Sequence, residues 1–273
     1  MFIRYAVRHI DVSAAASYVG ENFNAEAGFV PSYRVYPGQI NVFTDMAYKF
    51  YPKNSGIITM GPVVTASQTY IPNGALTDRN YSAGYTFRFL NTSMLTVSYN
   101  YMYSQLTSNF NPIDPQRYTQ FLNGEDYEWH FVSVKGQTNT RKTVNFSGQT
   151  SYGGFYNGTN WNVQGELSAR YQPYGNIALR VDYNDVKLAE GYGAEKLFLI
   201  GPRLDITFTD KIFLTTYYQY NNLLDNMNLN MRFQWRYQPA SDFFIVYTEN
   251  YLPETFASKN RALVFKFTYW LNL

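Results

Sequence analysis

Side chains of alternating character run along almost the whole chain. In residues 161–172 the apolar set is Trp161, Val163, Gly165, Leu167, Ala169 and Tyr171, and the polar set between them is Asn162, Gln164, Glu166, Ser168, Arg170 and Gln172. Successive side chains of a β-strand point to opposite faces, so this segment has one apolar and one polar face. The pattern recurs without helical stretches between. It is typical of a β-barrel in a lipid bilayer, apolar outside and polar inside.

We predict an all-β, antiparallel transmembrane β-barrel of about fourteen strands, within a range of about 12–16. Spanning strands need about 9–11 residues, and most of the predicted segments reach that length. Their approximate bounds are 3–19, 41–51, 56–67, 80–90, 93–105, 127–136, 141–152, 160–172, 176–186, 195–208, 211–220, 227–238, 241–250 and 261–272.

The connections between these segments alternate in length, as in barrels with short periplasmic turns and long extracellular loops. Short turns rich in Pro, Gly, Asn and Asp are expected at Pro52–Ser55, Leu90–Ser93, Gly136–Thr140, Pro173–Gly175, Thr209–Asp210 and Pro239–Asp242. Longer loops are expected at 20–40, 68–79, 106–126, 153–159, 187–194, 221–226 and 251–260. We therefore expect one barrel domain over residues 1–273.

The composition separates this fold from a soluble β-sandwich. Aromatic residues make up 19% of the chain and charged residues only 15%, against about 25% charged in ordinary soluble domains. The mean hydropathy of −0.35 is that of a soluble protein, but the two faces of a barrel strand average out in any window. A sandwich also alternates, yet its exposed face is rich in Lys and Glu, whereas the polar positions here favour Asn, Gln, Ser, Thr and Arg.

Several function classes are disfavoured by what the chain lacks. There is no cysteine for a disulfide framework or thiolate metal site, and a net charge of +2 is too small to suggest nucleic-acid binding. No run approaches the ~20 apolar residues of a spanning helix. The first ten residues have no apolar core of a signal peptide, so we expect a mature or truncated form of an exported protein.

The clearest alternation lies near the C-terminus and defines the expected lipid-facing side chains. Apolar and aromatic residues occupy every second position there, opposite Arg232, Arg236 and Lys266. The predicted lipid-facing set consists of Phe233, Trp235, Phe265, Phe267 and Tyr269 near the C-terminus and of Leu167 in the 161–172 segment.

Charged residues at polar positions of neighbouring strands are candidates for the barrel lumen. They are Arg88, Glu166, Arg170, Arg180, Asp182, Arg203, Asp205, Arg232 and Arg236. One interpretation is a constriction that selects solutes by charge. The other, which we favour, is a cross-strand network that ties the wall together. An excess of arginine facing water predicts a weak preference for anionic solutes.

No catalytic, metal or cofactor site is predicted. The chain has only two histidines, His9 and His130, too few for a histidine metal site. His130 and Ser133 have opposite parity on one strand, which disfavours a catalytic triad. The loop around Asp114 and Glu125 is rich in oxygen ligands but lacks ordered Ca²⁺-binding spacing. Aromatic residues of the same region could instead stack on sugar rings; these are Tyr118, Phe121, Tyr127 and Trp129, although an aromatic girdle explains the last two equally well.

Three segments resemble an uncharacterised outer-membrane family in which a family-9-like carbohydrate-binding module precedes a C-terminal barrel region. Residues 22–31 (NFNAEAGFVP), 232–247 (RFQWRYQPASDFFIVY) and 261–271 (RALVFKFTYWL) carry the resemblance, and 153–158 (GGFYNG) matches more weakly. Ser32 and Ala240 depart from the family's usual Arg and Gly. We do not expect residues 1–273 to include the module. The resemblance implies an outer-membrane location and the C-terminal part of a larger barrel, which would either close on itself or need a partner segment.

We therefore expect an integral outer-membrane barrel of a Gram-negative bacterium, embedded in the lipid bilayer, that acts as a channel or transport component for small hydrophilic solutes, carbohydrate among them. The alternative is a non-conducting anchor or scaffold subunit, its lumen plugged by the loop 106–126 or by a protein partner. A barrel hydrolase has little support, and we expect no enzyme activity.

Overall fold

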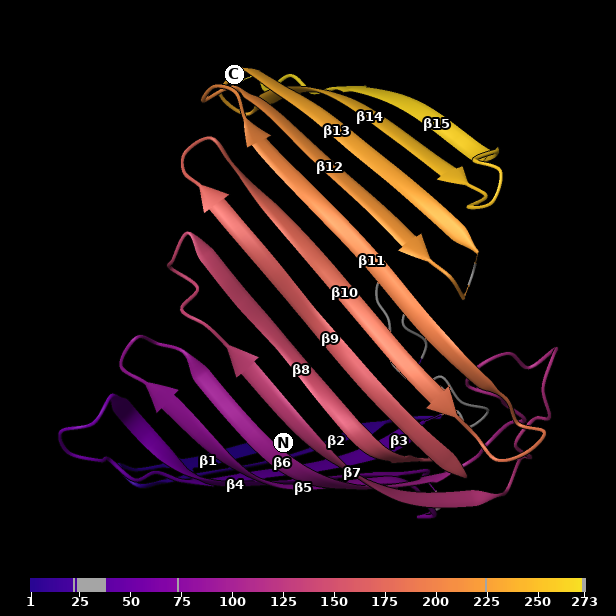
Figure 1. The fold of residues 1–273 in the computed structure, drawn as a ribbon. Helices are drawn as coiled ribbons and strands as arrows, with labels where there is room; N and C mark the ends of the chain where they lie inside the picture. The colour runs from indigo at the N-terminus through magenta and orange to yellow at the C-terminus, as the bar shows by residue number, and fades with distance from the viewer. Residues whose placement is uncertain (22, 24–37, 73, 224, 272–273) are drawn as a thin grey trace. The chain divides into compact units, whose positions relative to one another are not determined.

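The structure is a computed structural model that describes residues 1–21, 23, 38–72, 74–223 and 225–271. Its regular structure is entirely β, and each strand is hydrogen-bonded to its neighbours in sequence, in the order β1 to β15 (Figure 1). The strands are β1 (Phe2–Ala6), β2 (Ile10–Val19), β3 (Gln39–Tyr48), β4 (Ile57–Tyr70), β5 (Leu76–Phe89), β6 (Met94–Gln105), β7 (Asp126–Gln137), β8 (Val144–Phe155), β9 (Gly158–Tyr171), β10 (Gly175–Lys187), β11 (Ala194–Thr207), β12 (Ile212–Asn221), β13 (Asn226–Gln238), β14 (Ser241–Tyr251) and β15 (Ser258–Phe267). The all-β antiparallel fold is confirmed, with one strand more than the predicted fourteen or so.

The additional strand comes from the N-terminus. The segment predicted as one strand over 3–19 is the hairpin β1–β2, closed by a hydrogen bond from the Val7 amide to the Ile10 carbonyl at 2.8 Å. A residue outside the hairpin also binds the turn, because the Tyr51 hydroxyl donates to the Arg8 carbonyl at 2.5 Å. Alternation continues on both sides of a tight turn, so the pattern alone did not reveal the break.

The alternation of connection lengths is only partly confirmed. The short turns at 90–93, 172–174, 208–211 and 239–240 are present, and 106–125 is a long loop between β6 and β7. The predicted loop 153–159 is wrong: Gly153 and Gly154 belong to β8, and only Tyr156 and Asn157 separate it from β9. A Cβ on Gly154 would lie 2.9 Å from the Cβ of Trp129, so the glycine allows a close approach to β7. Most of the predicted loop 20–40, with the family-like stretch 22–31, lies outside the described residues.

The chain divides into two compact units. The first comprises Met1–Gly136, Gln149–Asn162 and Asp185–Glu195, and the second Gln137–Gly148, Val163–Asn184 and Lys196–Leu273. β1 is hydrogen-bonded to β2 and β15 to β14, and both strands are exposed along their whole length. The prediction of a single barrel domain over 1–273 stays a prediction.

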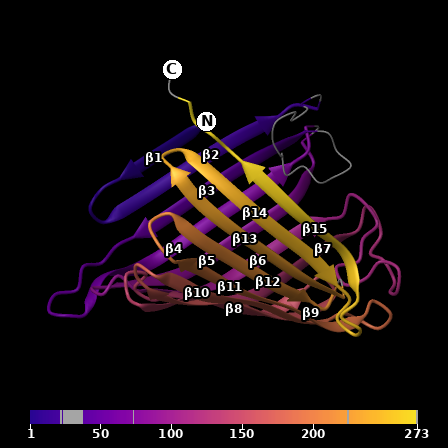
Figure 2. The same ribbon diagram turned by 90° about the horizontal axis from the view of Figure 1, so that it is seen from above.

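In the second unit the strand register sorts side chains onto two faces. Leu214 pairs with Phe233, and the next pair along the ladder is Thr215 with Arg232. Because neighbouring pairs point to opposite sides, the polar face carries Arg232 and the apolar face carries Phe233. The separation is not perfect, since Val246 pairs with Arg232 and shares the polar face. The strands β12 to β15 lie side by side in Figure 2.

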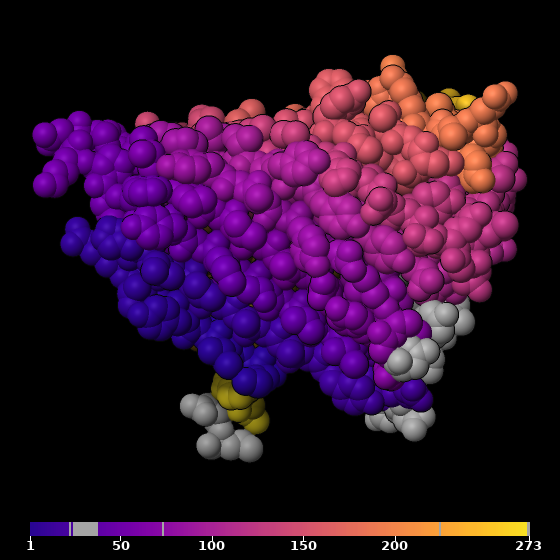
Figure 3. Space-filling model, turned by 90° about the horizontal axis from the view of Figure 1, so that it is seen from below, coloured from indigo at the N-terminus to yellow at the C-terminus, as the bar shows by residue number. Residues whose placement is uncertain are grey.

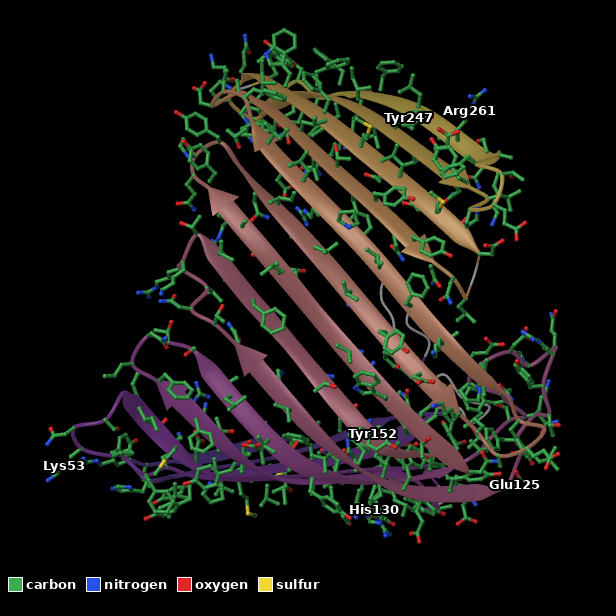
Figure 4. The ribbon with its side chains drawn as sticks, viewed as in Figure 1. Lys53, Glu125, His130, Tyr152, Tyr247 and Arg261 are labelled. Atoms are coloured by element: carbon green, nitrogen blue, oxygen red, sulfur yellow. The ribbon has the colours of Figure 1, made fainter. Side chains whose placement is uncertain are left out.

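The first unit shows the same division. Ser82 pairs with Asn100 and Thr86 with Thr96 on its polar face, where the two threonine hydroxyls lie 3.0 Å apart. His130 projects from β7 on the opposite, apolar face (Figure 4), and its ring stacks on Tyr99 at 5.6 Å between centroids. Figure 3 looks onto this side of the first unit, where the side chains of the N-terminal strands, indigo to purple, make a continuous surface.

Candidate functional site

The largest group of predicted polar-face residues meets in the second unit. A cavity of about 670 Å³ opens on the polar face of β9 to β13, and we call it the arginine cavity. Its charged lining residues are Glu166, Arg180, Arg203, Asp205 and Arg232, accompanied by uncharged polar groups such as Asn176, Thr215 and Asn230. Five of the nine charged residues predicted for the lumen therefore come together.

Only part of the charge in the arginine cavity is neutralised. The Arg203 guanidinium donates to both carboxylate oxygens of Asp205, at 2.9 and 3.1 Å. Arg180 and Arg232 are exposed and form no ion pair with any other described residue. Three guanidinium groups thus face two carboxylates, which leaves one positive charge in excess.

Two of the other charged candidates in the second unit satisfy local backbone or side-chain groups instead. Arg170 donates to the Thr140 carbonyl at the turn end of β9. Arg236 forms an ion pair with Asp242, its partner across the β13–β14 ladder, at 3.4 Å. Arg236 therefore makes a contact of the cross-strand network that we favoured for the whole set, whereas Arg170 binds the β7–β8 connection.

Asp182 also lies outside the lining of the arginine cavity. Its carboxylate accepts a hydrogen bond from the Asn184 amide at 3.1 Å, two residues along the same strand. Asp182 shares its face with Arg180 by strand parity.

Arg88 lies in the first unit, at a separate charged cluster that the sequence analysis missed. There Asp11 accepts from Arg4 and from Lys49, each at 2.9 Å, beside a cavity of about 590 Å³ whose lining includes Arg88. The alternation of β1 and β2 contained the signal, because Arg4 and Asp11 share the polar face once the segment is recognised as a hairpin.

Residues 106–125, between β6 and β7, form a folded loop that packs at one end of the strands of the first unit, which we call the loop end. In Figure 4 the label of Glu125 marks the loop end, and the label of Lys53, in the β3–β4 connection, marks the opposite end of the strands. Phe121 is fully buried, and its ring lies 4.7 Å from Tyr192 and 5.2 Å from Tyr156. The loop also reaches the start of β11, where the Tyr118 hydroxyl donates to Glu195 at 2.6 Å and thereby raises the pKa of that tyrosine.

The oxygen-rich side chains of this loop bind its own backbone. Asp114 Oδ1 accepts from the amides of Gln116 and Arg117, at 2.8 and 3.3 Å. Glu125 accepts from the Leu122 amide at 2.9 Å and from the Tyr127 hydroxyl at 2.7 Å, and these two bonds hold the pKa of Glu125 below its usual range. Within the described part of the chain no three acidic or histidine side chains gather as a metal site would require.

Beside this loop lies a second cavity of the first unit, of about 350 Å³, which we call the tryptophan cavity. Its lining combines aromatic with polar side chains, among them Trp129, Phe131, Tyr156, Asp78, Ser104 and Asn160. Trp129 is 7% exposed and lies on the parity of Ser133, whose hydroxyl bonds to Ser98 on the polar face at 2.8 Å. The interpretation of Trp129 as an aromatic-girdle residue is therefore wrong.

Most of the predicted lipid-facing residues share the apolar face of the second unit. Phe265 is 61% and Phe267 67% exposed, and they pair with Ile245 and Phe243 of β14. Leu167 and Trp235 are also exposed, while Phe233 is half-buried. Tyr269 lies beyond β15, which ends at Phe267, so its assignment by strand parity does not hold.

The two histidines lie in different places of the first unit, His130 on the apolar face and His9 in a turn. His130 stacks on Tyr99 on the apolar face, whereas Ser133 bonds to Ser98 on the polar face, so the two side chains point apart as predicted. His9 lies in the β1–β2 turn, with its Nδ1 2.9 Å from the Lys49 carbonyl.

The described residues contain no helix with the length and apolarity needed to cross a membrane. No protein-family model matches this chain, and a search of curated proteins likewise found no match.

Proposed function

We propose that this chain is an integral β-barrel protein of a Gram-negative outer membrane that passes small hydrophilic solutes and weakly favours anions. The observation that carries the proposal is the arginine cavity, whose lining has one positive charge in excess and whose polar face backs directly onto exposed Phe, Leu and Trp side chains. A water-facing wall with a net positive charge raises the local concentration of anions. The proposal includes no catalytic role.

The apolar faces support the membrane part of the proposal. Exposed apolar side chains such as Leu204, Phe265 and Phe267 sit on strands whose other face is polar, the reverse of a soluble sandwich. In the first unit the apolar face carries a row of rings, in which His130 lies 5.0 Å from Tyr101 and Tyr101 lies 5.9 Å from Tyr81. Aromatic rows of this kind mark the interfaces of outer-membrane barrels.

Single-channel recording on the protein reconstituted in planar bilayers tests this function. We expect conductance with an anion-to-cation permeability ratio above one, falling about threefold in Arg232→Gln, as the opposite effects of one unit charge ~12 Å from the path on anions and cations would produce in water. Arg261→Gln is the matched control, because Arg261 pairs with Glu249 on the apolar face and should leave the ratio unchanged. A folded, inserted protein that never conducts would refute the proposal.

The second candidate is a non-conducting anchor or scaffold, favoured by the packing of the loop 106–125. Leu106, Ile113 and Phe121 of this loop are buried, so it is a folded element rather than a solvated one. The resemblance to the C-terminal region of a larger barrel agrees with a chain that works with a partner segment. A closed pore together with a stable partner co-purified from native membranes would select this reading.

A further inference from the structure

We propose that the tryptophan cavity of the first unit binds an uncharged, polyhydroxylated ring about the size of one sugar residue. The inference deepens the proposed function, on which it rests for the supply of solute to this face. It concerns a different place from the arginine cavity, with different chemistry.

The size of the cavity sets the first limit. At about 350 Å³ it lies at the lower end of the range of about 300–1,000 Å³ typical of small-molecule sites. A single pyranose or cyclic polyol has a size appropriate to this volume.

The lining offers both kinds of surface that such a ring needs. Trp129, Phe131 and Tyr156 supply aromatic surface for the C–H faces of the ring. Hydroxyl, amide and carboxylate groups stand beside them, on Ser104, Ser151, Asn160 and Asp78. Apolar walls with a few placed polar groups are the usual composition of a ligand site.

These groups are held in place before any ligand arrives. The Trp129 ring packs 4.8 Å from Tyr156 and 6.1 Å from Phe155, in an aromatic cluster that continues to the fully buried Phe121. The Ser104 hydroxyl, in a residue only 5% exposed, donates to Asp78 at 3.0 Å and fixes its carboxylate. Side chains ordered in advance lower the entropy cost of binding.

Charge decides between ligand classes. The lining contains one carboxylate and neither lysine nor arginine, so it does not favour the anions that suit the arginine cavity. A cationic amine would use Asp78 and the ring faces. However, the hydroxyl and amide groups outnumber the single carboxylate, and their hydrogen-bonding capacity suits a ligand with several hydroxyl groups.

Isothermal titration of the full chain in detergent, with D-glucose and myo-inositol as probes, tests the inference. We expect saturable binding with a Kd on the order of millimolar, as for a ligand of so few atoms. Trp129→Leu should weaken binding at least tenfold, and Asp78→Asn, which keeps the shape and much of the hydrogen bonding, by less than about threefold. Tyr152→Leu, on the same strand as Ser151 but of opposite parity, should have no effect (Figure 4). Heat-modifiable gel mobility confirms that each variant is folded.

Three outcomes would overturn the assignment. The first is no saturable binding of either probe to the folded wild-type protein. The second is binding of tetramethylammonium in place of the sugars, lost in Asp78→Asn, which would make the cavity a cation site. The third is equal affinity for cyclohexanol, which would make it merely apolar. Binding without conductance in bilayers would leave this inference standing and refute the channel function alone.

Discussion

The polar faces of the two units differ, although both come from the same alternation of side chains. In the first unit the loop end carries buried aromatic rings, with Phe121 fully buried and Trp129 7% exposed. In the second unit the same kind of face carries a cavity lined by Arg180, Arg203 and Arg232. One face is organised by ring packing and the other by solvated charge.

This difference teaches that strand parity fixes which side a residue faces but not the chemistry of that side. The decisive factor at the loop end of the first unit is the segment 106–125, which supplies Phe121 to rings on β7 and on the connections 156–157 and 188–193. The β12–β13 connection in the second unit is much shorter, and Arg180, Arg203 and Arg232 stay exposed. Long-loop packing therefore turns a polar wall into a partly apolar pocket.

The largest expected effect lies in the ring packing of the first unit. Phe121→Ala should cost about 3–5 kcal/mol in the free energy of opening the loop 106–125, because it leaves a cavity among stacked rings. Hydrogen exchange of the loop amides measures this cost. Leu122→Ala, one residue along and 54% exposed, should change it by less than about 0.5 kcal/mol. Equal exchange in the two variants would mean that ring packing does not hold the loop.

A smaller effect is expected when charge is placed on either face of the second unit. Leu214→Lys puts an amine on the apolar face and should destabilise the protein in lipid vesicles by about 2–4 kcal/mol. Thr215→Lys, the next residue, points to the polar face beside Arg232 and should cost under about 1 kcal/mol. Guanidinium unfolding of the vesicle-inserted protein gives both values. A larger loss in Thr215→Lys would reverse our assignment of lipid and water to the two faces.

Removing the carboxylate of Asp205 from the arginine cavity should change ion selectivity in the direction opposite to the change expected for Arg232→Gln. Asp205→Asn frees the Arg203 guanidinium, so the permeability ratio of anions to cations should rise by about threefold. Reversal potentials in a salt gradient measure the ratio, and 1 M salt should suppress the difference. Asp11→Asn makes the same change at the ion cluster of the first unit. If the permeability ratio changed more in Asp11→Asn than in Asp205→Asn, the charges that set ion selectivity would be those of Arg4 and Lys49 and not those of the arginine cavity.

The sequence predicted the all-β fold and the shared polar face of five of the nine charged candidates because both depend on a local rule, and their role in a lumen stays a prediction. Glu166, Arg180, Arg203, Asp205 and Arg232 occupy alternate positions of regular strands, and parity alone brings them to one face. It did not predict the tryptophan cavity, because burial of Phe121 depends on contacts with Tyr192, far along the chain. It also misplaced Gly153 and Gly154, since the same glycines that favour turns allow close strand packing.

The smallest expected effect concerns how pH acts on the loop of the first unit. Glu125 has a lowered pKa, because its carboxylate accepts bonds from the Leu122 amide and the Tyr127 hydroxyl. A group with a lowered pKa in the folded state stabilises that state above its ordinary pKa of about 4.3, and this contribution is lost as the pH falls further. Hydrogen exchange of the Leu122 amide should therefore accelerate relative to its intrinsic rate as the pH falls below about 4. In Glu125→Gln the amide keeps one acceptor but cannot titrate, so the protection should be weaker and nearly independent of pH. If the variant kept the acid-induced loss, the titrating group would lie elsewhere, and Glu125 would be no more than a neutral cap of the loop.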